Sequence, residues 1–171
     1  GITWDSTWES EYREVQQKAA VLYRKQPRFQ LITTGKISQK KLLFEKQHLE
    51  RLQKASRYFA FPFDQEVLRQ KIEKEYQSCD IRQDYRIRIS LSKSGEIEIE
   101  RQVLTPLSSS FCQAKLCLQE ADLKQSFTYF KTTYRPHLTV GEQEIIYHTA
   151  DGKLLETSIG NLVLKMDGKL Y

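Results

Sequence analysis

The sequence has no long apolar run, few cysteines and no block of like charge. No stretch approaches the roughly 20 apolar residues that span a bilayer, and no secretory signal is evident. The three cysteines, Cys79, Cys112 and Cys117, are odd in number and lack CxxC spacing. This pattern argues against a disulfide framework and against a zinc site. We therefore expect a cytoplasmic protein with reduced thiols and no membrane contact.

The charges are balanced and dispersed. The net charge of +5 comes from 27 basic and 22 acidic residues mixed along the chain. Such a diffuse excess is weak evidence for nucleic-acid binding and suits small anionic ligands equally well. A hydrophobic content of 39% is enough for a packed core, and 171 residues suit one domain or slightly more. Because the chain opens on Gly1 and stops in a strand-like segment, we expect a piece of a longer polypeptide.

The first half of the chain carries helical and strand patterns in turn. Ser6 and Glu9 form a capping-box pattern, and the apolar spacing after them predicts a helix from 8 to about 25. Segments 29–32 and 41–44 are expected to pair as short strands. Two further helices are predicted, the first from about 46 and the second capped by Asp64. Their inner faces are expected to carry Leu49, Leu52, Ala55 and Phe59, then Val67, Leu68, Ile72 and Tyr76.

The second half is rich in strand patterns. Residues 85–91 and 96–103 alternate with a period of two around a Ser94-Gly95 turn. Residues 106–110 are expected to form a loop between two subdomains. Further strands are predicted at 114–118, 144–147, 153–155, 161–165 and 169–171, with hairpin turns at Asp151-Gly152 and Asp167-Gly168. The fold class expected is α+β, with an antiparallel sheet and helices followed by a β-rich part.

Lys131 is the first candidate for chemistry. It follows the aromatic stretch 127–130, and Arg135 comes four residues later. Burial and a neighbouring cation both lower the pKa of a lysine, and a partly neutral lysine can form an imine. On these residues alone, an ordinary surface lysine is the commoner interpretation.

Three other positions become candidate functional residues when they are considered together with Lys131. Arg51 lies three residues after His48, so both share a helix face, and an arginine there can hold a phosphate. Glu156 precedes a turn of small residues, where a carboxylate can keep a pyridine nitrogen protonated. Thr34 ends the first predicted strand. Taken singly, these are a solvated arginine, a turn carboxylate and a residue of ordinary β propensity.

Together, these segments resemble the fold-type IV enzymes that depend on pyridoxal 5′-phosphate (PLP). The resemblance is carried by the segments 29–34 (FQLITT), 48–52 (HLERL) with 56–62 (SRYFAFP), 130–135 (FKTTYR) and 155–164 (LETSIGNLVL). The family includes branched-chain and D-amino acid aminotransferases and 4-amino-4-deoxychorismate lyase. The KTTxR form resembles the lyase part of fused para-aminobenzoate synthases. Four motifs in the family's order make the resemblance fairly specific.

The resemblance implies a role for each position. Lys131 would hold PLP covalently and act as a general base, Arg51 would bind its phosphate, and Glu156 would pair with its pyridine nitrogen. Thr34 would assist proton transfer, and Arg135 would bind a substrate carboxylate. The implied reaction converts aminodeoxychorismate to 4-aminobenzoate, a folate precursor, with release of pyruvate. Relatives form homodimers, so a homodimer is also expected.

The N-terminus carries a second resemblance. Gly1–Ser6, Glu11–Glu14 and Lys18 are similar to the last segment of chorismate-binding synthases. That likeness implies that Glu14 is a Mg²⁺ ligand in an intact synthase domain, whose partner would be a glutamine amidotransferase subunit. The domain prediction is then 1–26 for the end of that domain, 27–120 for a small lyase domain and 121–171 for the start of a PLP-binding domain. Read without the resemblance, Glu14 and Lys18 are an i,i+4 helix pair worth roughly 0.2–0.5 kcal/mol.

The sequence also departs from the family. It ends before the family's last phosphate-binding segments, and 137–142 replaces a usually longer helix. We therefore expect this chain, as given, to bind PLP poorly or not at all. Three alternatives remain open: a fold-type IV aminotransferase, a non-catalytic remnant, and a nucleic-acid-binding sheet face with Arg86 and Arg88.

Overall fold

A computed structural model describes residues 4, 7–23, 27–105, 113–119, 126–139 and 143–170 of the chain. The expected α+β class is confirmed. The elements, in chain order, are α1 (Trp8–Tyr23), β1 (Leu31–Ser38), β2 (Lys41–Leu42), α2 (Glu45–Phe59), α3 (Gln65–Ser78), β3 (Tyr85–Leu91), β4 (Ile97–Val103), β5 (Ala114–Leu118), α4 (Ser126–Tyr129), β6 (Glu144–His148), β7 (Leu154–Thr157), β8 (Lys165–Met166) and β9 (Lys169–Leu170). The predicted loop at 106–110 lies outside the described residues.

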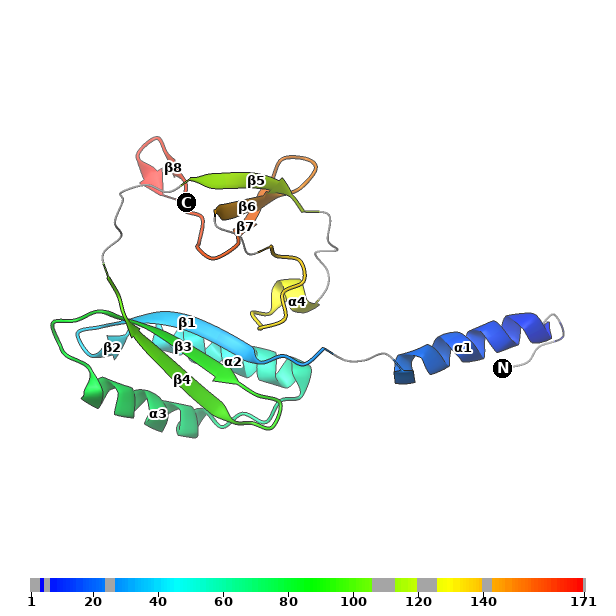
Figure 1. Cartoon of the computed structure of the whole chain (residues 1–171), viewed down its shortest axis with the longest axis horizontal. Helices are drawn as coiled ribbons and strands as arrows, with labels where there is room; N and C mark the ends of the chain where they lie inside the picture. Colours follow the sequence, from blue (N-terminus) through cyan, green and yellow to red (C-terminus); the bar gives the residue numbers. More distant parts are fainter. Residues whose placement is uncertain are drawn as a thin grey trace.

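The centre of the fold is a four-stranded antiparallel sheet in the order β2-β1-β3-β4. Helices α2 and α3 lie against one face of this sheet, as Figure 1 shows. The buried core lies between them and includes Leu31, Ile37, Leu52, Leu68, Ile72, Ile87, Ile89 and Leu91. This arrangement confirms the predicted packing of two helices on an antiparallel sheet.

The two packed helices begin close to where the sequence predicts. Asp64 caps α3, with its Oδ1 accepting hydrogen bonds from the backbone N–H groups of Glu66 and Val67 at 2.8 and 3.2 Å. In α2, Leu49, Leu52 and Ala55 are buried, as the apolar spacing requires. One detail of the α3 prediction is wrong, because the Val67 side chain is 41% exposed.

The second face of the sheet carries mostly polar side chains. Along β1, residues 31, 33, 35 and 37 face the helices, so residues 32, 34 and 36 point the other way. The register pairs Thr34 with Arg88 and Lys36 with Arg86, so these side chains share the uncovered face. In Figure 1 the second group of strands lies on this side of the sheet.

That second group is a three-stranded sheet in the order β5-β6-β7. The pair β6–β7 is antiparallel, whereas β5 and β6 are parallel. The β8–β9 hairpin turns through Asp167 and Gly168, whose positive φ values of 49° and 77° fit an Asp-Gly hairpin turn. The predicted strand 161–165 is wrong for its first four residues, since pairing begins only at Lys165.

Helix α1 extends away from both sheets in Figure 1. Its apolar residues Trp8, Tyr12 and Val15 are 71, 54 and 59% exposed. The predicted cap Ser6 lies outside the described residues, and the described cap contacts join Thr7 with Ser10. Across the described ranges, no helix is both long and apolar enough to cross a membrane.

Candidate active site

Lys131 is placed by a short stretch of backbone pairing with β1. The backbone N–H of Ile32 donates to the carbonyl of Lys131 at 3.0 Å, and the N–H of Thr133 donates to the carbonyl of Gln30 at 2.9 Å. Between these bonds, Leu31 and Thr132 form an isolated antiparallel bridge. The lysine segment is therefore not a full strand but a single bridge after the one-turn helix α4.

The bridge also fixes the direction of the lysine. Thr132 and Leu31 are both fully buried and lie on the helix side of the sheet. Because neighbouring residues of an extended chain alternate, the Lys131 side chain emerges on the uncovered face, beside Ile32. The Thr132 hydroxyl donates to the carbonyl of Tyr134 at 2.7 Å, which bends the chain directly after the lysine.

An aromatic cluster anchors this segment against the first part of the fold. The Phe127 ring packs against Phe29 and Phe59 at centroid distances of 5.0 and 5.5 Å, and the Phe130 ring packs against Tyr58 and Phe59 at 4.6 and 5.3 Å. Contacts of this geometry are worth about 0.5–1.5 kcal/mol each beyond the area they bury. The cluster holds α4 close to α2, so the lysine is not carried on a free loop.

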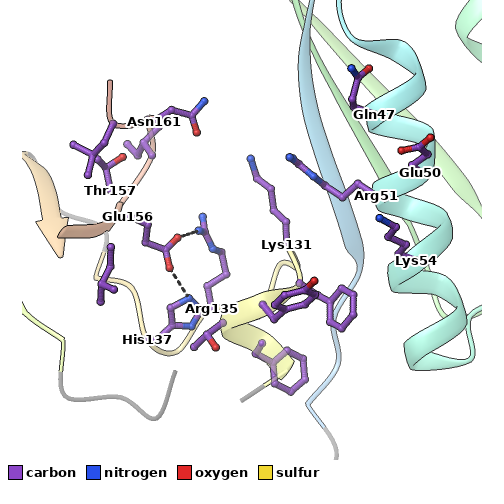
Figure 2. A pocket seen from close by; sticks show the side chains of 18 residues that line it. Gln47, Glu50, Arg51, Lys54, Lys131, Arg135, His137, Glu156, Thr157 and Asn161 are labelled. Carbon is purple, nitrogen blue, oxygen red and sulfur yellow. Dashed lines mark hydrogen bonds and ion pairs between the residues drawn. The ribbon is translucent and has the colours of Figure 1, made fainter. Parts of the chain in front are cut away.

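Lys131 stands at a cavity of about 600 Å³. That volume lies within the range of pockets that bind small molecules, roughly 300–1,000 Å³. One wall comes from α2, the other from β7 and the turn after it, as Figure 2 shows. The residues labelled there are Gln47, Glu50, Arg51, Lys54, Lys131, Arg135, His137, Glu156, Thr157 and Asn161.

The pKa of the Lys131 amine is lowered from its usual value. Partial burial is the largest cause, followed by the positive charges of Arg51 and Arg135 and then those of Arg86 and Arg88. Four arginines therefore act on one amine. The neutral, nucleophilic form of this lysine is more populated near neutral pH than that of a free lysine.

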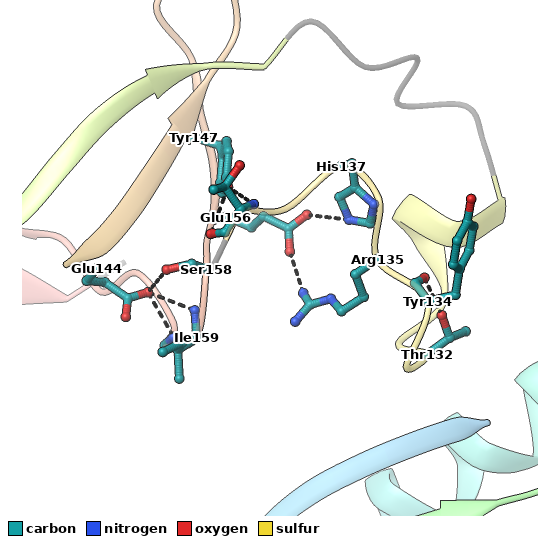
Figure 3. Close-up of polar contacts among 11 residues, drawn as sticks. Thr132, Tyr134, Arg135, His137, Glu144, Tyr147, Glu156, Ser158 and Ile159 are labelled. Atoms are coloured by element: carbon teal, nitrogen blue, oxygen red, sulfur yellow. Dashed lines mark hydrogen bonds and ion pairs between the residues drawn. The ribbon is translucent and has the colours of Figure 1, made fainter. Parts of the chain in front are cut away.

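Glu156 lies on the opposite wall and has two basic neighbours. Its Oε2 accepts a hydrogen bond from Nη2 of Arg135 at 3.2 Å, and its Oε1 lies 3.6 Å from Nε2 of His137. The His137 side chain is only 4% exposed, against 28% for Arg135 and 40% for Glu156. Figure 3 shows both contacts, which fix the carboxylate from one side.

The turn after Glu156 is held by a second carboxylate, that of Glu144. Its Oε1 accepts hydrogen bonds from the Ser158 hydroxyl at 3.0 Å and from the backbone N–H groups of Ile159 and Gly160 at 2.8 and 3.3 Å. Burial raises the pKa of Glu144, but these hydrogen bonds outweigh burial and lower it overall. Glu144 thus fixes the chain that follows the pocket carboxylate (Figure 3).

Thr34 does not line the cavity, but it shares the uncovered sheet face with Lys131. The bridge sets Lys131 beside Ile32, and Thr34 is two residues further along β1. Such a diagonal pair on one face of a sheet has Cα atoms roughly 7–8 Å apart. Its neighbour Thr33 points the other way and is hydrogen-bonded to Nδ1 of His48 at 2.7 Å.

His48 fixes the position of α2, the helix that carries Arg51, against β1. A Cβ atom on Gly35 would lie 2.7 Å from Nε2 of His48, so only glycine lets α2 approach β1 this closely. Burial, and then the charge of Arg51, lower the pKa of His48. His48 therefore packs against the sheet, whereas Arg51 reaches the cavity.

Lys54 and His137 are among the cavity residues that had no assigned role in the sequence. Lys54 lies one helical turn after Arg51 and adds a second cation to that wall, and the i,i+3 spacing could have revealed it. His137 follows Lys131 by six residues in an irregular segment, where no periodic signal exists. The structure thus brings Lys131, Arg51, Arg135 and Glu156 to one cavity, together with these two residues.

Glu14 lies apart from the cavity, on α1, where it forms an ion pair with Lys18. Among the residues that the structure describes, no group of three or more acidic, histidine or cysteine side chains is arranged to hold a metal ion. The role of Glu14 as a Mg²⁺ ligand in an intact synthase domain stays a prediction.

A lysine enclosed by cations at the edge of an antiparallel sheet, with a fixed carboxylate opposite, defines a lysine-centred site for an anionic ligand. The family whose model matches the chain is amino-transferase class IV, over residues 30–171. The chain belongs to this family, whose members are PLP-dependent enzymes. No curated protein matches it.

Solved structures support the same fold. A candidate branched-chain amino acid aminotransferase from Thermotoga maritima has a TM-score of 0.69 and 16% identity, with 99% of this chain and 60% of that one covered. A candidate 4-amino-4-deoxychorismate lyase from Haemophilus somnus has a TM-score of 0.62 and 20% identity, with 85% and 76% covered. A hypothetical aminotransferase from Mycobacterium tuberculosis, with α-ketoglutarate and PMP bound, gives 0.61 and 17%, with 82% and 59% covered. The chain thus spans between 59% and 76% of the length of these proteins.

The side chains of the cavity fit PLP by their chemistry. The cofactor has a phosphate, an aldehyde and a basic ring nitrogen. Arg51 and Lys54 offer cations on one wall, Lys131 offers an amine of lowered pKa, and Glu156 offers a carboxylate on the other wall. Each group of the cofactor therefore has a counterpart of suitable charge.

Proposed function

We propose that the chain forms part of a PLP-dependent 4-amino-4-deoxychorismate lyase, which releases pyruvate and leaves 4-aminobenzoate. The observation that carries the proposal is Lys131, whose amine is half-buried, has a lowered pKa and lies between the cations of α2 and the carboxylate of β7. The KTTxR form of its segment favours the lyase among enzymes of this family.

The side chains on the two walls of the cavity would bind and orient the cofactor. Arg51 and Lys54 bind the phosphate, since a guanidinium can hold it bidentately. Lys131 would hold the cofactor through Nζ, and bound PLP would supply an electron sink for the reaction. Glu156 would hold the ring nitrogen and would favour its protonated form.

Proton movement falls to Lys131 and Thr34. The Nζ of Lys131 would accept a proton from the substrate as a general base. The Thr34 hydroxyl shares its sheet face and can pass a proton between substrate and lysine. Arg135 and the arginines of β3 supply positive charge for substrate carboxylates. The overall elimination needs no second substrate, because the atoms of aminodeoxychorismate equal those of 4-aminobenzoate and pyruvate.

We further propose that this lyase is fused to a para-aminobenzoate synthase component I, with its glutamine amidotransferase subunit as partner. The family match begins at residue 30, so α1 with Glu14 lies outside it. A helix with an exposed apolar stripe suits the end of another domain. Dimerisation, cytoplasmic location and a Mg²⁺ site in the synthase domain belong to the same proposal.

The direct test is to trap the lysine. The purified chain is incubated with millimolar PLP, reduced with borohydride and digested, and mass spectrometry locates the pyridoxyl group. Label on Lys131 supports the proposal, and Lys131→Ala provides the matched control. Label spread evenly over surface lysines, with no preference for Lys131, contradicts a PLP site.

A second assay separates the lyase from an amino acid aminotransferase. The likeness to the Thermotoga maritima structure, which covers 99% of this chain, favours the aminotransferase as the second candidate. Pyruvate release from aminodeoxychorismate without any amino acceptor supports the lyase. Turnover that requires an α-keto acid supports the aminotransferase, and no Lys131-dependent activity in either assay supports a non-catalytic remnant.

A further inference from the structure

His137 has a buried side chain in the cavity wall that the proposed function leaves without a role. Only 4% of the side chain is exposed, and its Nε2 lies 3.6 Å from Oε1 of Glu156. Its Nδ1 is buried and has no hydrogen-bond partner among the described residues. A buried histidine with one nitrogen directed at a carboxylate and the other left bare calls for an explanation.

We propose that His137 is a positioning residue that fixes Glu156 for a protonated heteroaromatic nitrogen, by directing an Nε2–H group at the carboxylate while its Nδ1 stays unprotonated. The proposal rests on the proposed function, because it gives Glu156 the ring nitrogen of PLP as its ligand.

The unpartnered nitrogen argues for this tautomer. An imidazolium would carry a second N–H at Nδ1, and a buried donor without an acceptor is unfavourable by about 1–3 kcal/mol. Burial lowers the pKa of His137, and the Arg135 charge lowers it further, while Glu156 acts in the opposite direction. The neutral ring with its proton on Nε2 directs a donor at Glu156 and leaves no buried donor at Nδ1.

The two basic partners of Glu156 contact different carboxylate oxygens and differ in charge. Arg135 takes Oε2 and His137 approaches Oε1, so each carboxylate oxygen has one neighbour and keeps a further lone pair. A neutral histidine orients the carboxylate without adding a second full positive charge. The negative charge of Glu156 therefore stays available to a cationic ring nitrogen.

The segment that carries His137 is itself fixed. The backbone N–H of Thr139 donates to the Tyr147 hydroxyl at 2.6 Å, which ties the segment to β6. Arg135 lies on the same segment, and Glu156 faces it from β7. Changing the imidazole should thus alter the Glu156 contact more than it alters the fold.

The experiment compares two probes on the wild-type chain and on two His137 variants. PLP and 1-deaza-PLP, in which a C–H replaces the ring nitrogen, are titrated against wild type, His137→Phe and His137→Gln. Bound cofactor is followed by the absorbance of the lysine-bound form. Phenylalanine keeps the ring size and removes the donor, whereas glutamine keeps a donor near the position of Nε2.

We expect His137→Phe to weaken PLP binding by about tenfold, which is the size of losing one polar contact with a charged group. Binding of 1-deaza-PLP should change by less than about twofold, and His137→Gln should restore most of the PLP affinity. In a Glu156→Gln background, His137→Phe should have little further effect. Equal weakening of both probes, or unchanged PLP binding in His137→Phe, overturns the proposal.

A cofactor-free measurement separates this inference from the proposed function. Nitrogen-15 NMR of the chain alone should find a neutral His137 ring protonated at Nε2, and Glu156→Gln should lower the His137 pKa. If that pair is seen but neither probe attaches to Lys131, the proposed function fails, and the ring-nitrogen role fails with it. If PLP attaches to Lys131 but His137→Phe has no effect, only the role of His137 is refuted.

Discussion

Thr132 is the residue through which the fold aims Lys131, so its replacement should alter both stability and site. It is fully buried, opposite Leu31, and its hydroxyl donates to the carbonyl of Tyr134 at 2.7 Å. Thr132→Val keeps the shape and removes this hydrogen bond. An intramolecular hydrogen bond contributes about 0.5–1.5 kcal/mol net. Because Tyr134 is 39% exposed, we expect water to reach its freed carbonyl, so the loss should stay near 1 kcal/mol, within that range.

The matched control is Thr132→Ser, which keeps the hydroxyl and removes one methyl group. Burial of one such group is worth about 0.8 kcal/mol, so both variants should lose similar free energies of unfolding in urea. They should differ at Lys131. The valine variant loosens the bend after the lysine and should lower the yield of PLP trapped there, whereas serine should not. Equal trapping by both variants would refute the claim that this hydrogen bond aims the lysine.

Three further outcomes are expected. Arg51→Gln should raise the pKa of Lys131 and shift its reaction with phosphate-free pyridoxal to higher pH. Lys36→Gln should leave that pH profile unchanged, because Lys36 forms an ion pair with Asp84 at 2.6 Å. Equal pH profiles for the two variants would contradict this prediction. Gly35→Ala should lower the free energy of unfolding by about 1–3 kcal/mol, through a clash with His48 that urea titration can measure. The pKa of His48 is lowered in the folded state, so the unfolded chain binds more protons and stability should fall as pH drops below about 6.5. His48→Gln should flatten that dependence, and an unchanged slope would exclude His48 as its source.

Local patterns were enough to predict much of the first part of the fold. The Asp64 cap, the apolar stripe of α2 and the period-two alternation of β3 each depend on residues a few positions apart. Predictions from such short-range patterns agree with the structure because the sheet and its two helices are built from segments that are neighbours in the sequence. Val67 shows the limit, since a residue at helical spacing can still lie at the rim of the buried face.

The lysine segment could not be predicted in the same way. Its aromatic residues have strand propensity, yet Phe127 lies in α4 and Phe130 just after it, and both serve as packing anchors for residues of α2 and the segment before β1. The pairing of Leu31 with Thr132 spans a hundred residues and has no local signature. The parallel pairing of β5 with β6 is equally non-local. The site was predictable only as a set of residue types in a familiar order, and not as a geometry.

Arg86 and Arg88 show what the geometry adds. Their alternation along a strand suits a solvated sheet face or a phosphate-contacting surface equally well. The register sets Arg88 beside Thr34, on the face where Lys131 emerges, and both arginines help to lower the pKa of that lysine. Arg86 and Arg88 therefore contribute to the positive potential at the Lys131 amine. In the proposed site, the positive charges that lower the pKa of Lys131 would also attract a phosphate and carboxylates, so one set of arginines would serve both reactivity and the choice of an anionic ligand.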